Sequence, residues 1–227
     1  MSSRAERVAT PTIVGLIATI AVTDVVANVV VPEDAKLPVK LVIAVVYLAW
    51  ARGRAGLSWA ELGLGRDDVA SGLRWGVPAA AVVGAVIILL VVVSQSQFEQ
   101  SSVAHDSTTA RFLEPLVFIP LGTVVFEEVI FRGVLLGVLL RWSTRRSAIV
   151  VSAVVFGLWH LPPALRDARG DGFAGGLGVV IGTVAFTSLA GVLFAWLRLR
   201  SGSLIAPVCA HIASNSFAYA AAVLALQ

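Results

Sequence analysis

The sequence contains few charged residues and almost no cysteine. Charged side chains make up 14% of its 227 residues, whereas hydrophobic side chains make up 58%. A soluble domain of this size would carry about 25% charged residues. The low charge therefore excludes a soluble domain and predicts an integral membrane protein. The only cysteine, Cys209, excludes an intramolecular disulfide and is expected to be a buried, inert thiol, because its neighbours are apolar.

Lysine is scarce as well, since fifteen of the seventeen basic residues are arginine. In a membrane protein a net charge of +3 reports topology rather than nucleic-acid binding, so no nucleic-acid partner is expected. The chain has no internal repeat and no soluble stretch long enough for a separate domain. We therefore expect a single membrane domain over residues 1–227, located in the cell membrane with several passes.

Seven apolar segments follow one another, each near the roughly 20 residues that a helix needs to cross a bilayer. They cover residues 12–31, 37–51, 75–93, 112–140, 148–161, 173–197 and 204–226. The fifth is expected to end at Pro162 and Pro163. Residues 58–75 mix tryptophan and leucine with charged residues, which favours an interfacial stretch with a short helix on the membrane surface. The expected fold is all-α, a polytopic membrane helix bundle of about seven to eight transmembrane helices.

The basic residues agree with this layout when the N-terminus is placed in the cytoplasm. The cytoplasmic segments then hold eleven of them: Arg4, Arg7, Arg52, Arg54, Arg66, Arg74, Arg141, Arg145, Arg146, Arg198 and Arg200. The outer segments hold five: Lys36, Lys40, Arg111, Arg166 and Arg169. Cytoplasmic loops of membrane proteins carry the excess of basic residues. This distribution predicts a cytoplasmic N-terminus and, for seven spans, an outer C-terminus.

Ionisable side chains occur inside the fourth apolar segment, where they are costly unless they have a partner or a task. Glu128 and Arg132 are four residues apart, share a helix face and can form an ion pair. Glu127 is rotated by about 100° from Glu128 and is free for chemistry. In the first segment, Asp24 and Asn28 also share a face, and we expect them to line a cavity or a helix contact.

Three further polar residues can reach the level of Glu127. His160 lies at the end of the fifth segment, and His211 and Asn215 share one face of the seventh. With alternating spans, Glu127 and His160 lie about 20 Å above the cytoplasmic edge, Asn215 about 18 Å and His211 about 12 Å. The sequence thus predicts one layer of polar side chains from three helices. Hydrogen bonding between helices is an alternative explanation for His211 and Asn215.

These residue types suit the hydrolysis of an acyl bond. A carboxylate beside a histidine can take a proton from water and deliver it to a leaving group. A second histidine with an amide can donate hydrogen bonds to an oxyanion. Glu127, His160 and His211 could also bind zinc or another divalent metal. The His-Glu-x-x-His helix of common metalloproteases is absent, so glutamate chemistry without a metal is favoured.

At these residues the chain resembles the CPBP family of intramembrane proteases, which includes the type II CAAX prenyl endopeptidases and bacterial relatives linked to bacteriocin self-immunity. That family carries three motifs, and all three are present within residues 112–220. They are Glu127-Glu128-x-x-x-Arg132, Phe156-x-x-x-His160 and His211-x-x-x-Asn215.

The resemblance implies that Glu127 is the water-activating base, assisted by His160. It implies an oxyanion site formed by His211 and Asn215, and it leaves metal dependence open. The expected substrate is a membrane-associated protein or peptide within the lipid bilayer, whose identity, prenylated or not, the sequence does not reveal.

In the same family pattern, Glu128 and Arg132 pair and hold their helix. Two other functions are compatible with polar residues in mid-membrane. An ion-coupled transporter would also place carboxylates and histidines there. A non-catalytic immunity or scaffold protein would keep the cluster for structure alone.

Overall fold

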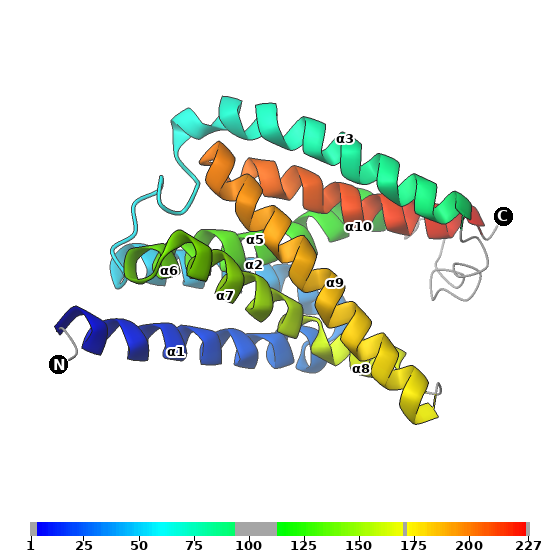
Figure 1. The fold of residues 1–227 in the computed structure, drawn as a ribbon, viewed down its shortest axis with the longest axis horizontal. Coiled ribbons are helices and arrows are strands. Elements are labelled where there is room, and N and C mark those ends of the chain that lie inside the picture. Colours follow the sequence, from blue (N-terminus) through cyan, green and yellow to red (C-terminus); the bar gives the residue numbers. More distant parts are fainter. Residues whose placement is uncertain (1–3, 94–112, 170–171, 226–227) are drawn as a thin grey trace.

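The computed structural model describes residues 4–93, 113–169 and 172–225. Within these ranges the chain forms helices and no strand, which confirms the expected all-α membrane bundle. The helices join end to end into seven rods, each of which overlaps one of the seven apolar segments. Figure 1 shows that successive rods run in alternating directions.

The first three rods form the N-terminal part of the bundle. They are α1 (Arg4–Val25) continued by η1 (Val26–Val30), then α2 (Glu33–Gly53), then η2 (Arg66–Asp68) continued by α3 (Val69–Val93). The fourth rod consists of η5 (Glu114–Val125), α5 (Phe126–Glu128), η6 (Val129–Leu135) and α6 (Leu136–Trp142). The remaining rods are α7 (Arg145–Trp159) with α8 (Leu161–Asp167), α9 (Gly172–Ser201) and α10 (Ile205–Ala225).

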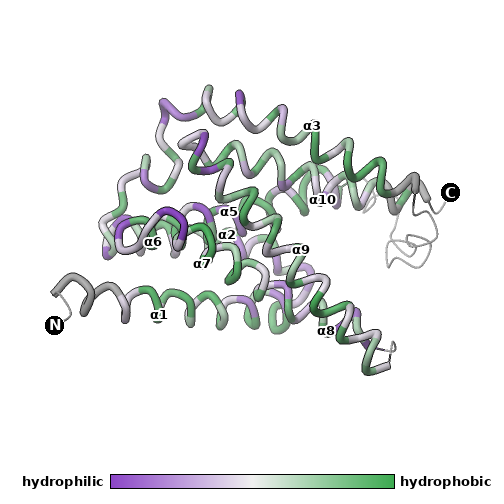
Figure 2. The backbone as a smooth tube through the Cα atoms, viewed as in Figure 1, coloured by the Kyte–Doolittle hydropathy of each residue, from purple (hydrophilic) through white to green (hydrophobic). Residues whose placement is uncertain are grey.

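Only four helices of the described chain are long and apolar enough to cross a membrane, fewer than the seven to eight spans expected. They are Thr10–Val30, Arg66–Leu90, Arg145–Asp167 and Gly172–Ser201. The other three rods are not among these four. The second rod carries charges at both ends, the fourth contains Glu127, Glu128 and Arg132, and α10 contains His211 and Asn215. Figure 2 shows hydrophobic stretches along much of α3 and α9, and hydrophilic residues around α5.

The fifth rod does not stop at Pro162 and Pro163 as expected. α7 ends at Trp159, and a second short helix, α8, begins at Leu161. Proline is tolerated in the first turn of a helix, where its missing N–H would have no intrahelical partner. His160 lies at the break between the two helices, with φ −89° and ψ 3°.

The segment before α3 forms turns instead of the expected separate short helix, and it packs two leucines into the bundle. Leu57 and Leu62 are both fully buried. Ser58 and Glu61 exchange hydrogen bonds in the manner of a capping box: the Ser58 backbone N–H donates to Glu61 Oε2 at 2.7 Å, and the Glu61 backbone N–H donates to Ser58 Oγ at 3.1 Å. The Ser58 N–H and the Arg141 guanidinium lower the pKa of the Glu61 carboxyl.

Two arginines hold this segment against the helices. Arg141 donates to both carboxylate oxygens of Glu61 at 2.9 Å, and Arg198 donates to the backbone carbonyls of Ala60 and Glu61 at 3.1 and 2.9 Å. Gly63 has φ +75°, and a Cβ there would lie 2.2 Å from Arg198 Nε, so only glycine fits. These arginines therefore have structural roles in addition to their place in the topology.

Glycines bring neighbouring rods into close contact. A Cβ added at Gly157 in α7 would lie 2.7 Å from the carbonyl oxygen of Val184 in α9. A Cβ at Gly76 in α3 would lie 3.0 Å from Cα of Ala206 in α10. Small residues of this kind let membrane helices approach each other. Gly182, by contrast, has open space around it.

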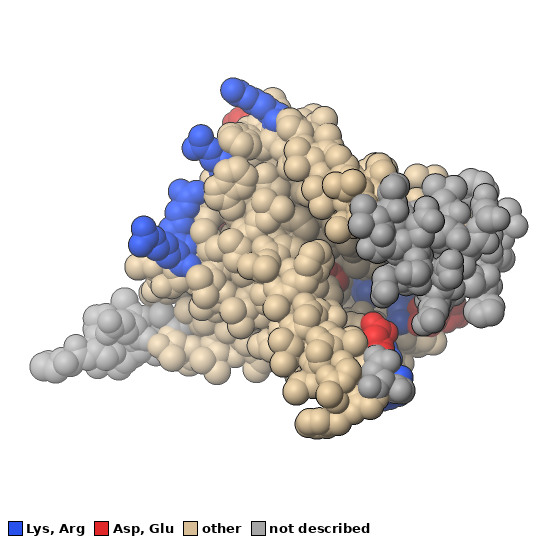
Figure 3. Space-filling model, turned by 45° about the vertical axis from the view of Figure 1, so that its right-hand side comes forward, with Lys and Arg blue, Asp and Glu red and all other residues tan. Residues whose placement is uncertain are grey.

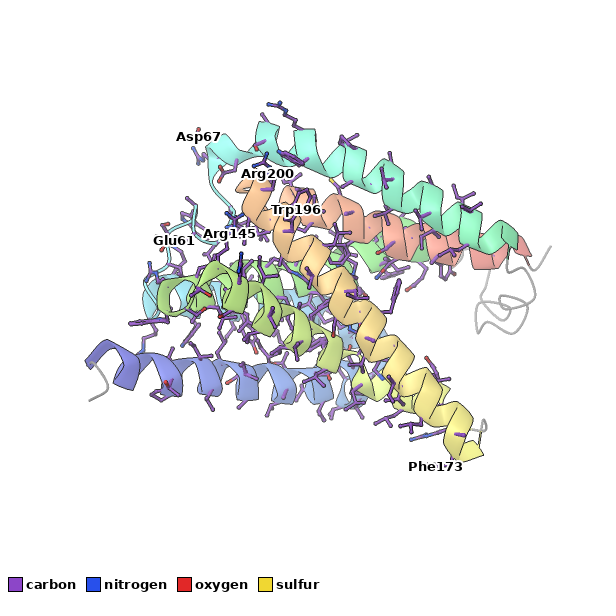
Figure 4. All side chains as sticks on the ribbon, in the orientation of Figure 1. Glu61, Asp67, Arg145, Phe173, Trp196 and Arg200 are labelled. Atoms are coloured by element: carbon purple, nitrogen blue, oxygen red, sulfur yellow. The ribbon has the colours of Figure 1, made fainter. Side chains whose placement is uncertain are left out.

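The charged side chains divide between the two ends of the bundle. In Figure 3, lysine and arginine side chains gather along one edge, while acidic and basic side chains meet near the opposite edge. Figure 4 places Arg145 and Arg200 at the first end, where Glu61 and Asp67 also lie, and Phe173 at the far end of α9.

Candidate active site

The helix that carries Glu127 and Glu128 has an unusual winding. A single α-helical turn, α5, lies between two stretches of wider π-helix, η5 and η6. Pro115 and Pro120 lie in η5, where each removes one backbone donor. π-Helical turns occur often at functional sites because they redirect side chains. Both glutamates are buried at this point.

The ion pair expected from the sequence is present at the centre of the bundle. Arg132 Nη1 donates to Glu128 Oε1 at 3.0 Å, and neither side chain is exposed. The guanidinium lies 4.0 Å from the ring centroid of Phe156 and 5.1 Å from that of Phe194. Cation–π contacts of this kind stabilise a desolvated guanidinium. Arg132 Nη2 also donates to the carbonyl oxygen of Gly191 at 3.4 Å.

His211 connects the two glutamates. Its Nδ1 lies 2.9 Å from Glu128 Oε1, and its Nε2 lies 3.8 Å from Glu127 Oε2. Asn215 Nδ2 lies 3.4 Å from His211 Nε2, one turn further along α10. The ring is buried and stacked on Phe194 at 4.7 Å. Glu128 therefore contacts His211 as well as Arg132, whereas the sequence suggested that it belongs with Arg132 alone.

The two carboxylate oxygens of Glu127 have different surroundings. The indole Nε1–H of Trp159 donates to Oε1 at 3.1 Å, which fixes the plane of the carboxylate. Oε2 is buried and has no hydrogen-bond partner among the described residues. A buried polar atom without a partner is rare and costly, and such atoms are often functional. The free oxygen is the one that faces His211 Nε2.

His160 lies nearby but does not touch Glu127. Its Nδ1 is 2.9 Å from the carbonyl oxygen of Phe156, and because a carbonyl only accepts, Nδ1–H is the donor. In the neutral ring, Nε2 then carries the lone pair. The Phe156 ring packs edge-on against both His160 at 4.8 Å and His211 at 5.8 Å. The structure thus brings Glu127, His211 and Asn215 together, and separates His160 from His211 by one aromatic ring.

Three residues near Glu127 were not recognised as part of this site from the sequence. Trp159 directly precedes the motif histidine, and its indole N–H donates to Glu127. A buried tryptophan N–H needs a hydrogen-bond acceptor, and this requirement was the sequence feature that could have pointed to Trp159. Asp24, which accepts from Asn28 Nδ2 at 2.8 Å, interacts electrostatically with His160 and Glu127. Lys40 interacts electrostatically with Glu127, although the sequence placed it in an outer segment. No sequence signal pairs either residue with the fourth rod.

The residues named as possible metal ligands do not converge. In the part of the chain that the structure describes, no three His, Cys, Asp or Glu side chains are grouped so that they could hold a metal ion. Glu127 and His211 are close enough to bind the same metal ion, but the His160 ring makes its contact with the Phe156 carbonyl instead. Zinc ligands lie about 2 Å from the ion, so these three side chains as they lie do not form a zinc site.

Residues 109–217 match the family model described as type II CAAX prenyl endopeptidase Rce1-like. This part of the chain belongs to the Rce1-like family. The match confirms the resemblance to the CPBP proteases and spans all three motifs and all the site residues named from them. No curated protein and no solved structure matches the chain in the corresponding comparisons.

The Rce1-like domain and the four apolar helices together indicate an integral membrane protein. The family is one of membrane proteases, so its match indicates endopeptidase activity within the membrane, on peptide substrates in a lipid bilayer. The domain covers 109 of the 227 residues and leaves α1, α2 and α3 outside it. The side chains of Asp24 and Lys40 therefore reach the site from outside the family match.

The Glu128–Arg132 pair can be tested by a double-mutant cycle. Arg132→Met leaves a buried carboxylate without its main counter-charge, so it should destabilise the protein by about 3–5 kcal/mol. The double variant Glu128→Gln with Arg132→Met should lose less stability than the two single variants added together. Denaturation in detergent micelles measures the free energy of unfolding of the single and double variants. Arg146→Met, on an exposed arginine of α7, is the control. Additive effects of the two substitutions would contradict the pairing.

Proposed function

We propose that the chain is an intramembrane endopeptidase in which Glu127 activates a water molecule that attacks a peptide bond. The observation that carries the proposal is the buried oxygen Oε2 of Glu127, which lacks a hydrogen-bond partner among the described residues while Oε1 is held by Trp159. A carboxylate held at one oxygen and free at the other is oriented to accept a proton from a bound water.

In the proposed reaction, Glu127 Oε2 removes a proton from water as the water oxygen attacks the peptide carbonyl carbon. A tetrahedral intermediate forms, and its negative charge is on the former carbonyl oxygen. The carbon–nitrogen bond then breaks, and the proton taken by Glu127 passes to the departing amine. The reaction therefore consumes one water and gives one carboxylate and one amine, with no other reactant.

His211 lies between the two glutamates and provides a donor in this scheme. Its Nδ1 lies 2.9 Å from Glu128 Oε1, and its Nε2 lies 3.8 Å from Glu127 Oε2. The Asn215 amide lies 3.4 Å from Nε2. In the proposed reaction, the His211 ring and the Asn215 amide together stabilise the oxyanion.

His160 has a supporting role in the proposal. Because Nδ1–H is used by the Phe156 carbonyl, Nε2 is left as an acceptor that can orient the attacking water or relay a proton to the amine. The Phe156 ring keeps His160 at a fixed distance from His211. The role is assigned to His160 because this residue occupies the histidine position of the family's Phe-x-x-x-His motif. Because His160 does not contact Glu127, a water molecule or the substrate would connect the two side chains.

The catalytic role of Glu127 can be tested with purified protein in mixed micelles. Solubilised membrane proteins serve as substrate, mass spectrometry maps new peptide termini, and the buffer contains the chelator EDTA. Wild-type protein should produce new termini, and Glu127→Gln should reduce them by at least about 100-fold, since general-base catalysis contributes roughly 10²–10⁴.

The matched control is Glu61→Gln, which alters an exposed glutamate in the segment before α3, paired with Arg141 near the end of the fourth rod, and should retain cleavage. Cleavage by Glu127→Gln at the wild-type rate would contradict the role of Glu127. Activity that appears only when the chelator is replaced by zinc would contradict the metal-free form of the proposal.

We also propose that the N-terminus and the arginine-rich end of the bundle are cytoplasmic, because cytoplasmic loops carry the basic excess. Single cysteines introduced by Arg145→Cys and Phe173→Cys, each in a Cys209→Ser background, would mark the two ends seen in Figure 4. A membrane-impermeant maleimide should label the cysteine at position 173 in intact cells, and the one at position 145 only after permeabilisation. The reverse pattern would overturn the orientation.

A further inference from the structure

A cavity of about 510 Å³ lies between the first half of α2 and η5. Its walls include Lys36, Leu37 and Lys40 from α2, and Phe118, Gly122 and Thr123 from η5. Ligand-binding cavities in proteins typically measure about 300–1,000 Å³, so this space is large enough for a short stretch of peptide. It combines apolar and charged walls, unlike a surface that faces lipid tails.

Two residues of the cavity wall lie near the proposed base. Lys40 Nζ lies 5.5 Å from the ring centroid of Phe126, the residue next to Glu127, and Lys40 interacts electrostatically with Glu127. Thr123, on the opposite wall, lies one turn before Glu127 in the same rod. Lys40 and Thr123 therefore bring part of the cavity wall close to the proposed base.

The two lysines of the chain differ in their partners. Lys36 forms an ion pair with Glu33, a residue with an 87% exposed side chain. Lys40 is only 8% exposed, and within the described residues it makes a cation–π contact but no hydrogen bond or ion pair. A buried ammonium without a hydrogen-bonded counter-ion is costly, and an anion that reaches it recovers part of that cost.

We propose that this cavity receives the substrate and that Lys40 binds a carboxylate of the substrate peptide. The inference rests on the proposed endopeptidase function. The substrate of an endopeptidase is a polypeptide, and the anionic groups of a polypeptide are its carboxylates. Lys40 would hold that carboxylate beside Glu127 and so select which peptide bond reaches the base. Lys40 is thus a specificity-determining residue supplied by α2, outside the Rce1-like domain.

The charges at the cavity mouth limit the kind of peptide that fits. Glu33, Asp34 and Glu114 also border the cavity, and Glu33 is already paired with Lys36. Asp34 disfavours a strongly acidic peptide, whereas the Lys40 ammonium attracts a single carboxylate. The matching substrate is an apolar peptide with a single carboxylate that reaches Lys40.

Binding can be measured without cleavage by using peptides with N-methylated peptide bonds. The probe is a dansylated apolar hexapeptide in three forms: a free C-terminal acid, a C-terminal amide, and the amide with one internal glutamate. Fluorescence titration of purified wild-type protein in micelles should show about tenfold or tighter binding of at least one carboxylate form over the plain amide. The two carboxylate forms distinguish a terminal from a side-chain source.

Lys40→Met should abolish this preference, and Lys40→Arg should keep it because the positive charge remains. Arg54→Met, on an exposed arginine that follows the opposite end of α2 and does not line the cavity, is the comparison and should retain the preference. Equal binding of all three probes to the wild type would overturn the proposal, as would a preference that survives Lys40→Met. An equal loss of affinity for every probe in Lys40→Met would also overturn it, because Lys40 would then act through Glu127 or the fold.

The result is independent of catalysis. If the probes show the preference but Glu127→Gln still cleaves membrane proteins, the mechanism fails and the binding site stands. If cleavage depends on Glu127 but a carboxylate on the probe makes no difference, the binding site fails and the mechanism stands.

Discussion

The ion pair between Arg132 and Glu128, closed off from water at the centre of the bundle, is the interaction on which the site depends. Three helices meet around it: Arg132 donates to a backbone carbonyl of α9, stacks on Phe156 of α7, and shares Glu128 with His211 of α10. Breaking a buried pair leaves an uncompensated charge, which is strongly destabilising. The pair therefore fixes both the packing of α7, α9 and α10 and the position of His211.

From this anchor the site extends outward to Glu127. His211 reaches Glu128 with one ring nitrogen and faces Glu127 with the other, so the ion pair and the proposed base belong to one network. Trp159 holds the first oxygen of Glu127 and leaves the second without a partner among the described residues. The two adjacent glutamates thus differ in their partners: Glu128 contacts Arg132 and His211, whereas Glu127, the proposed base, accepts from Trp159. Phe156 makes four contacts in the site, through its ring to Arg132, His160 and His211 and through its carbonyl oxygen to His160.

Helical periodicity was sufficient to predict seven helical segments and the Glu128–Arg132 pair, because both depend on spacing within one helix. The estimated depths correctly brought Glu127, His211 and Asn215 together. The sequence could not predict that His160 faces a carbonyl, that Trp159 donates to Glu127, or that Lys40 of α2 lies near the base. Those contacts depend on which helices pack side by side, and on the break before Pro162 that turns His160. Among the described residues, four helices have the length and composition of a membrane span, fewer than the seven to eight expected, and the fourth rod carries three ionisable residues in its middle.

The claim that Glu127 activates water, and does not itself attack the peptide, is tested most directly by cleavage in water labelled with ¹⁸O. Under single-turnover conditions, with a substrate identified by mapping of termini, one ¹⁸O atom should appear in the new carboxylate of the product. Glu127 itself should carry none, as measured by mass spectrometry of the peptide that contains it. Label in the Glu127 carboxylate after one turnover would mean that Glu127 forms a covalent intermediate, and it would contradict the account.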